Sequence, residues 1–236
     1  MYQTKMHFIK PEMNLADLFF ENPNLLLMME HLSLNYVFND KSVKELCEYN
    51  NINLNLFITF ANLYNGFYNI NISFFNENDI PIIIKFLRNS HHYYKSEQYP
   101  EVKNLIAQLI KLNDSKEVKL IERFFDEYFE EVIEHFNYED KTAFPYFISL
   151  ANKEKITIDN FSAKVYKDHH TDIEFKLMEL KNLLLRHIPL KNDNSIRRKL
   201  LKLLFEIDYD LTIHSKIEDE ILIPLVREIE LKSINE

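Results

Sequence analysis

Glycine, tryptophan and cysteine are almost missing from this sequence of 236 residues. It contains one glycine, no tryptophan and one cysteine. So little glycine argues against glycine-rich phosphate-binding loops and against all-β folds, which need many tight turns. A single cysteine, Cys47, excludes a disulfide within the chain and favours a reducing compartment. Leucine, isoleucine, lysine and glutamate are abundant instead, and this composition favours helices.

The charge and the hydrophobic pattern exclude further classes of protein. The formal net charge is −9, and an acidic surface repels phosphate backbones, so we expect no nucleic-acid partner. The N-terminal residues lack the apolar run of a signal peptide, and the most apolar run, Ile80 to Leu87, is too short to span a bilayer. We therefore expect a soluble cytoplasmic protein that does not enter a membrane.

The pattern of helix signals predicts an all-α fold in two parts. Residues 1–65 are expected to form a small N-terminal domain of short helices, in which Asn14 caps the first. Residues 66–78 contain the only glycine and several asparagines, and we interpret them as a linker. Residues 79–236 contain four long helical segments with short connections, as in an antiparallel four-helix bundle. Pro100 inside the first segment predicts a kink.

The second long segment shows the helical periodicity most clearly. It is expected to run from about Ser115 to Asn152. Its apolar side chains recur at steps of three and four residues, as one buried stripe of a helix requires. These positions are Val118, Ile121, Phe125, Tyr128, Val132 and His135.

Two copies of one motif lie in the C-terminal part. The stretch from His135 to Pro145 reads HFNYEDKTAFP, and the stretch from His214 to Pro224 reads HSKIEDEILIP. Each copy has a histidine, three residues, Glu-Asp, four residues and a proline. On a helix, a spacing of four puts the histidine and the glutamate on one face, one turn apart. An imidazole and a carboxylate so placed can hold one metal ion.

Two histidine pairs complete the pattern. The pair His91-His92 precedes the first motif copy by 43 residues and the pair His169-His170 precedes the second by 44, counted from the second histidine of each pair. The four long segments therefore form a tandem repeat of a helix pair. Adjacent positions on a helix point about 100° apart, so only one histidine of each pair can face the centre. The spacing leaves open which one it is.

Four histidines and two glutamates from four helices predict a centre of two metal ions. Each ion would hold two histidines, and Glu139 and Glu218 would bridge the two ions. Imidazole suits iron, zinc and copper, whereas carboxylates that bridge two ions favour iron or manganese. Structural zinc usually has four ligands that include cysteine. Iron is therefore the expected metal.

This arrangement resembles the hemerythrin-like domain, and specifically the RIC family, the di-iron proteins implicated in repair of iron–sulfur centres. In that family a histidine precedes a Leu-Pro-Glu-Leu-like stretch, which is YPEV here. The apolar run after the second histidine pair matches the family's third helix. Oxygen-carrying hemerythrins instead use five histidines and a final His-x4-Asp, which this chain lacks. The ligands that the resemblance implies are His92, His135, Glu139, His170, His214 and Glu218.

The resemblance implies two iron ions as cofactor and a cytoplasmic role in repairing iron–sulfur clusters after nitrosative or oxidative damage. The small-molecule partner would be nitric oxide or oxygen, and damaged iron–sulfur proteins would be clients. The family's N-terminal domain carries a Cys-Cys loop, but Val37-Phe38 stands in its place here. Because that change puts a thiol-dependent step in doubt, a second hypothesis is a di-iron sensor of oxygen or nitric oxide that signals through its N-terminal domain. The oligomeric state stays open, a homodimer included.

Three other side chains have two interpretations each. Tyr128 and Tyr166 share helix faces with predicted ligands, so each either donates a hydrogen bond near the metals or is an ordinary core aromatic. We favour the core for both. Cys47 lies on an apolar helix face, where a small buried side chain is more common than a redox role.

Overall fold

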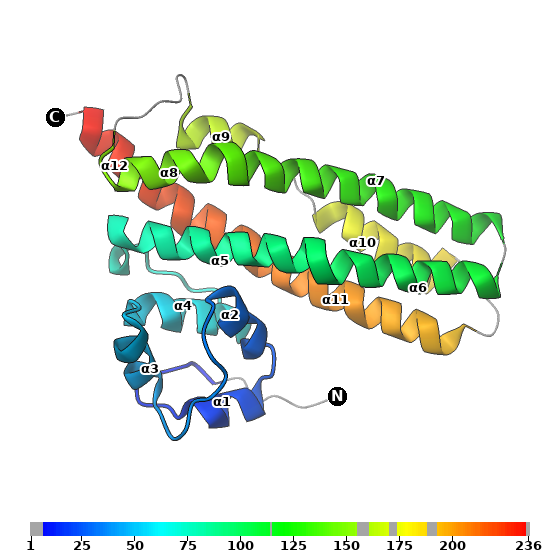
Figure 1. Ribbon diagram of the computed structural model, residues 1–236, viewed down its shortest axis with the longest axis horizontal. Helices are drawn as coiled ribbons and strands as arrows, with labels where there is room; N and C mark the ends of the chain where they lie inside the picture. Colours follow the sequence, from blue (N-terminus) through cyan, green and yellow to red (C-terminus); the bar gives the residue numbers. More distant parts are fainter. Residues whose placement is uncertain (1–6, 114, 155–160, 170–173, 188–192, 235–236) are drawn as a thin grey trace. The chain divides into compact units, whose positions relative to one another are not determined.

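The computed structural model describes residues 7–113, 115–154, 161–169, 174–187 and 193–234, and over these ranges it is all-helical (Figure 1). The prediction of an all-α fold with several long helices is confirmed. Within the same ranges, no helix is both long and apolar enough to cross a membrane.

The chain divides into two compact units that interleave along the sequence. Unit 1 consists of Met1–Asn89, Tyr146–Ala163 and Ser215–Glu236. Unit 2 consists of Ser90–Pro145 and Lys164–His214. Several helices continue from one unit into the other, so the units do not follow the expected limits at residues 65 and 79. The three-part division into domain, linker and bundle stays a prediction.

Unit 1 begins with four short helices close to those expected from the sequence. They are α1 (Leu15–Glu21), α2 (Leu25–His31), α3 (Val43–Asn50) and α4 (Leu54–Tyr64). The Asn14 side chain accepts a hydrogen bond from the backbone N–H of Asp17, which confirms the predicted cap. Ser42 and Glu45 form a reciprocal capping box at the start of α3. Helices α2 and α3 both pack against α4.

The expected linker contains local structure of its own. It forms two short 3₁₀ helices, η1 (Ile72–Phe74) and η2 (Glu77–Asp79). The Asn76 side chain caps η2, and the carboxylate of Asp79 accepts a hydrogen bond from the backbone N–H of Asn76. Asp79 therefore ends a short turn that leads directly into the first long helical segment.

Each expected long segment is a run of consecutive helices. The first contains α5 (Ile80–Tyr93), η3 (Tyr94–Gln98) and α6 (Tyr99–Leu112). The second contains α7 (Lys116–Tyr138), η4 (Glu139–Ala143) and α8 (Phe144–Ala151). The third contains α9 (Ala163–His169), α10 (Glu174–Asn182) and η5 (Leu183–His187). The fourth contains α11 (Asn194–Ile217), η6 (Glu218–Leu222) and α12 (Ile223–Ile234).

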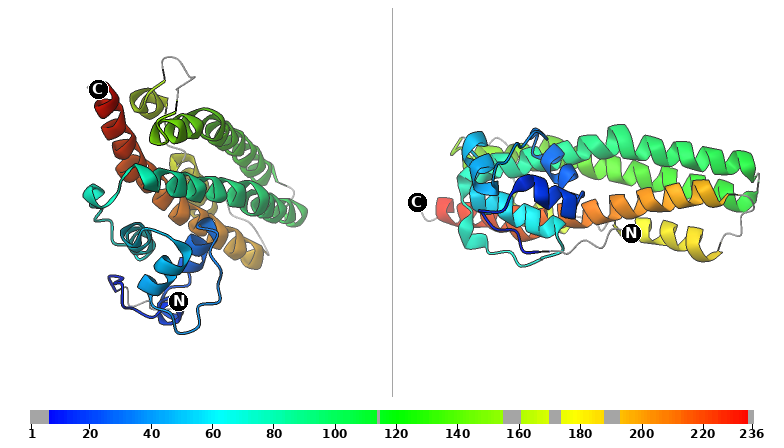
Figure 2. Two further views of the ribbon diagram at one scale, coloured as in Figure 1. Left: turned by 60° about the vertical axis from the view of Figure 1, so that its left-hand side comes forward. Right: turned by 90° about the horizontal axis from the view of Figure 1, so that it is seen from below.

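In unit 2, helices α6, α7, α10 and α11 lie side by side along their lengths (Figures 1 and 2). Helices α6 and α10 both contact α7. Helix α11 is joined to α10 by an ion pair of 2.6 Å between Lys181 and Asp208. The predicted stripe on α7 is confirmed, because all six of its side chains are buried: Val118, Ile121, Phe125, Tyr128, Val132 and His135.

Segments η3, η4 and η6 are π-helical turns, and each is followed by one residue and then a proline. These prolines are Pro100, Pro145 and Pro224. A proline within a helix lacks the N–H for the bond to residue i−4, and its ring clashes with that carbonyl. A widened turn just before the proline accommodates both defects. In place of the kink expected at Pro100, the helix contains a π-turn just before this proline. Both copies of the motif contain a π-turn at the equivalent position.

Candidate metal centre

The centre of the site is Glu139, which is the first residue of the π-turn η4 and is fully buried. Its Oε2 lies 3.1 Å from Nε2 of His91, and its Oε1 lies 3.1 Å from Nε2 of His135. The two oxygens of one carboxylate thus face two different imidazoles. Tyr166 donates a hydrogen bond of 2.6 Å to Oε1.

The approach of His91 to Glu139 has the geometry of two ligands of one cation. Although the two atoms lie 3.1 Å apart, they do not have hydrogen-bond geometry. The other ring nitrogen of His91, Nδ1, lies 3.1 Å from Oδ1 of Asp140. If Nδ1 carries the proton, Nε2 presents a lone pair to the carboxylate, and the two repel each other unless a cation lies between them. Ligand atoms bound about 2.1 Å from one ion lie roughly 3 Å apart, as these do.

Two further buried groups join this pair. His91, Glu139, His214 and Glu218 each offer one ligand atom, and the four atoms lie within 4.8 Å of one another. His214 and Glu218 lie one turn apart on the continuous run of α11 and η6. Nδ1 of His214 lies 2.8 Å from Oγ of Ser90, so its Nε2 is the nitrogen available to an ion. This buried His/Glu cluster can hold a metal ion, and its donors fit one.

Glu139 and His91 shift each other's pKa in opposite directions. Burial alone would raise the pKa of Glu139, but its interactions with His135 and His91 lower that pKa well below the usual range. Burial alone would lower the pKa of His91, but Asp140 and Glu139 raise it overall. The raised pKa of His91 favours its protonated form, so protons compete with a metal ion for this ring.

The structure corrects the choice between His91 and His92. His91 is buried in the cluster, whereas His92 is exposed. The resemblance selects His92 because the family's histidine lies shortly before the stretch that is YPEV here, and the π-turn Tyr94–Gln98 lies between His92 and that stretch. A π-turn adds a residue to the helix and rotates everything before it relative to a regular α-helix. The cluster therefore contains the histidine one position before the one that the resemblance selects.

The other predicted ligands have different outcomes. Glu139, His214 and Glu218 meet in the cluster, and His135 lies beside Glu139. His170 lies outside the described residues, as does the side chain of His169.

Two partners of the cluster histidines were missed by the sequence analysis. Asp140 and Ser90 contact the Nδ1 atoms of the two cluster histidines. Tyr166 is buried and also donates a hydrogen bond to Glu139, so the interpretation that was not favoured for it, a hydrogen-bond donor at the predicted site, holds. Tyr128 is buried and its hydroxyl lies 3.5 Å from that of Tyr99, in agreement with a place in the core. For Asp140, the sequence signal is the Glu-Asp pair that both motif copies share.

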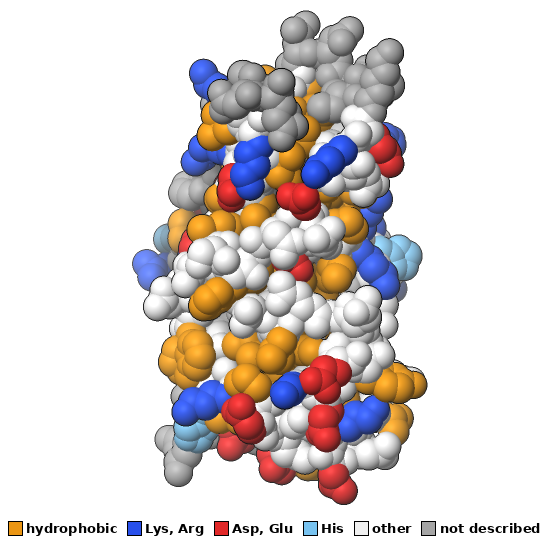
Figure 3. Space-filling model, turned by 90° about the vertical axis from the view of Figure 1, so that its left-hand side faces the viewer, with side chains coloured by type: hydrophobic (Ala, Val, Ile, Leu, Met, Phe, Trp, Pro, Cys, Tyr) orange, Lys and Arg blue, Asp and Glu red, His pale blue; other side chains and the backbone are white. Residues whose placement is uncertain are grey.

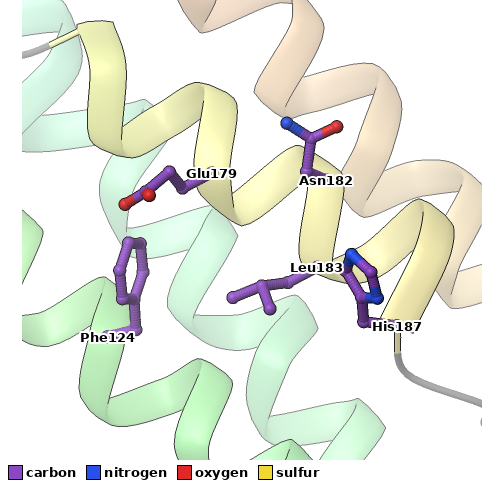
Figure 4. Close-up of a pocket in the computed structure, with 5 residues that line it drawn as sticks. All are labelled: Phe124, Glu179, Asn182, Leu183 and His187. Carbon is purple, nitrogen blue, oxygen red and sulfur yellow. The ribbon is translucent and has the colours of Figure 1, made fainter.

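A pocket of about 330 Å³ lies elsewhere in unit 2 and has a different character. Its lining residues are Phe124, Glu179, Asn182, Leu183 and His187, none of which belongs to the cluster. The carboxylate of Glu179 lies beside the ring of Phe124, while His187 lies beyond Leu183 (Figure 4). Because the two ionisable groups do not converge, this pocket does not resemble a metal site.

The region that resembles the family's Cys-Cys loop contains no thiol. Val37 is 73% exposed, and the ring of Phe38 stacks on Phe19 with the centroids 4.6 Å apart. Cys47 is buried in α3, and burial raises the pKa of its thiol to about 12. The interpretation of Cys47 as a small buried side chain is confirmed.

Cys47 should therefore be inert in the native protein. Because the thiolate is the reactive form, we expect negligible labelling by a disulfide reagent at pH 8 and one thiol per chain after unfolding in denaturant. Cys47→Ser should leave metal content unchanged and lower the free energy of unfolding by about 1–3 kcal/mol, since it buries a hydroxyl. Cys47→Ala is the matched control without the hydroxyl. Fast labelling of the native protein at pH 8 would contradict the buried position.

Comparisons with known proteins add no relative: no family model, curated protein or solved structure matches this chain. On the part of the face in Figure 3 that is described, acidic and basic side chains are interspersed with hydrophobic ones. That part of the surface lacks the continuous basic patch typical of nucleic-acid binding.

Proposed function

We propose that this chain is a non-haem di-iron protein with a hemerythrin-like four-helix bundle, and that it takes part in the repair of iron–sulfur clusters damaged by nitrosative or oxidative stress. The observation that carries the metal centre is the position of Glu139 between two imidazoles. Each carboxylate oxygen lies 3.1 Å from a different histidine, as a carboxylate that bridges two ions requires. The family resemblance carries the choice of iron and of the repair role.

The roles of the chain's own residues follow from this geometry. Glu139 and Glu218 would bridge two ions, and His91, His135 and His214 would be terminal ligands. Tyr166 holds the carboxylate of Glu139 through a hydrogen bond. Ser90 and Asp140 fix which ring nitrogen of each histidine faces the ions. A bound di-iron centre would supply open coordination positions for nitric oxide or oxygen and a source of iron for damaged clusters.

A sensor of oxygen or nitric oxide is the second hypothesis, and the N-terminal region favours it. Val37 and Phe38 offer no thiol, and Cys47 is buried, so a repair step that uses a thiol of this region has no donor here. Restoration of a damaged iron–sulfur enzyme by the purified chain would support repair. Stoichiometric binding of nitric oxide that changes affinity for a partner protein would support sensing. In both cases we place the protein in the cytoplasm.

Metal content is the first test. Protein produced with ample iron and purified without oxygen should contain close to two iron ions per chain, because the donors are imidazoles and bridging carboxylates. Iron and zinc should be quantified together, and the electronic spectrum should show two coupled ions. One tightly held zinc ion with no capacity for a second ion would overturn the di-iron proposal. Binding should weaken in acid, because protons compete for the histidines.

A further inference from the structure

The two Glu-Asp pairs of the repeat differ in their surroundings. In the first copy, Oδ1 of Asp140 lies 3.1 Å from Nδ1 of His91, and its Oδ2 lies 3.4 Å from Nζ of Lys95. In the second copy, Asp219 holds the same place after Glu218 but is exposed. Identical sequence positions therefore have different surroundings, and only a structure can reveal this.

The two cluster histidines consequently differ in the charge next to them. The partner of Nδ1 is a carboxylate for His91 and the neutral hydroxyl of Ser90 for His214. A carboxylate that accepts the Nδ1–H bond fixes the tautomer and makes the opposite nitrogen a stronger donor to a metal. A hydroxyl fixes the orientation but adds no negative charge. Charge-assisted hydrogen bonds are also roughly twice as strong as neutral ones.

The position of Asp140 is itself well defined. Its side chain is 27% exposed, as is that of Lys95, whereas His91 beside it is buried. The ammonium group of Lys95 also lies 5.4 Å from the centre of the Phe136 ring. The His91 ring stacks on the same Phe136 ring, with 4.0 Å between centroids. Asp140 is thus held by a cation on one oxygen and a ring N–H on the other.

We infer that Asp140 is a positioning residue that makes the His91 side of the cluster the tighter of two unequal metal-binding positions. This inference rests on the proposed two-metal centre and adds an order of binding to it. The first ion enters where His91 and Glu139 face each other with Asp140 behind, and the second enters beside His214. The aspartate that follows Glu218 has no corresponding role.

The test is a titration of the metal-free protein with cobalt(II), followed by the absorbance bands of the bound ion. The wild-type chain should bind two ions in two phases of unequal affinity. Asp140→Asn should weaken the first phase by about 10–100-fold and shift its bands, because loss of an outer carboxylate has effects of this size. Asp219→Asn removes the same charge from the other motif copy and should titrate like the wild type. Asp140→Glu keeps the carboxylate and should restore part of the first phase.

The outcomes of this titration distinguish a failure of the Asp140 inference from a failure of the proposed two-metal centre. A wild-type chain that takes up fewer than two cobalt ions overturns the two-metal centre itself. Two ions in the wild type, with unchanged affinities and bands in Asp140→Asn, overturn the role of Asp140 alone. The same holds if Asp219→Asn has an equal effect, because general surface charge would then explain both. If circular dichroism shows that Asp140→Asn has lost helix, the folded Asp140→Glu variant decides: a first phase as weak as that of Asp140→Asn, despite the retained carboxylate, overturns the role.

Discussion

Glu139→Gln is expected to lower the metal affinity of the chain by about 100-fold or more and to leave its helical content unchanged. The Glu139 carboxylate lies 3.1 Å from both His91 and His135. Glutamine has the same shape, but its amide nitrogen cannot bind a metal ion and its oxygen carries no full charge. Removal of one terminal histidine affects one ion, whereas removal of a bridge affects both. This substitution should therefore have a larger effect than any other single ligand change on α7.

Stability measurements should show the same loss. An ion that binds only the folded chain raises the free energy of unfolding, by about 2.7 kcal/mol at a free concentration of 100 times Kd. Added metal should raise the Tm of the wild type and leave that of Glu139→Gln unchanged. The metal-free variant should be less stable by about 1–3 kcal/mol at neutral pH, because two buried histidines lose the carboxylate charge that lies 3.1 Å from each of them. Burial opposes ionisation of Glu139, but the histidines hold its pKa well below 4.5, so this difference should disappear only in strong acid.

The matched control is Glu134→Gln. Glu134 is an exposed glutamate on the same helix, close before Glu139, so the change in net charge is identical. It should keep the metal content and the metal-dependent rise in Tm. Full metal content in Glu139→Gln, or equal loss in both variants, would show that Glu139 is not the centre of the site.

Most of the secondary structure follows from local signals in the sequence. Asn14 caps α1 as its side chain predicts, and the apolar stripe of α7 is buried at every expected position. These features depend on neighbours three or four residues away, which a sequence displays directly. The partition into two units is different, because it depends on which helices pack together over long distances. No spacing in the sequence carries that information.

The π-turns explain where the prediction of the site succeeded and where it went wrong. The pairs His135–Glu139 and His214–Glu218 lie on regular helix up to the glutamate, so a spacing of four predicts their common face correctly. The choice of His92 rests on its position relative to the YPEV stretch, and η3, where the helix has an additional residue, lies between the two. Each of these π-turns lies just before a proline, but a proline alone predicts only that the helix is disrupted and does not predict a π-turn. Asp140 and Ser90 act through contacts between segments far apart in sequence.

His91→Ala and His92→Ala test directly which of the two neighbouring histidines binds metal. The two histidines are neighbours, so the variants remove the same side chain from adjacent positions of one helix. His91 is 1% exposed and faces Glu139, whereas His92 is exposed. We expect His91→Ala to bind one ion less and to lose coupling between the ions, while His92→Ala retains both ions with an unchanged spectrum.

Without metal, His91→Ala should also have a lower free energy of unfolding than His92→Ala. The ring of His91 stacks on Phe136 and Phe144, with centroids 4.0 and 5.7 Å away, so its removal opens a cavity in the core. A large-to-small change at such a site costs about 2–5 kcal/mol, whereas a surface change stays within about 0.5 kcal/mol. Because a destabilised chain could lose metal for that reason alone, His91→Gln is the third variant. It refills most of the space with a neutral side chain and should still lose the ion. If His92→Ala loses metal while both His91 variants keep it, the family-derived register is right and the helix before the π-turn is rotated by one residue relative to this structure.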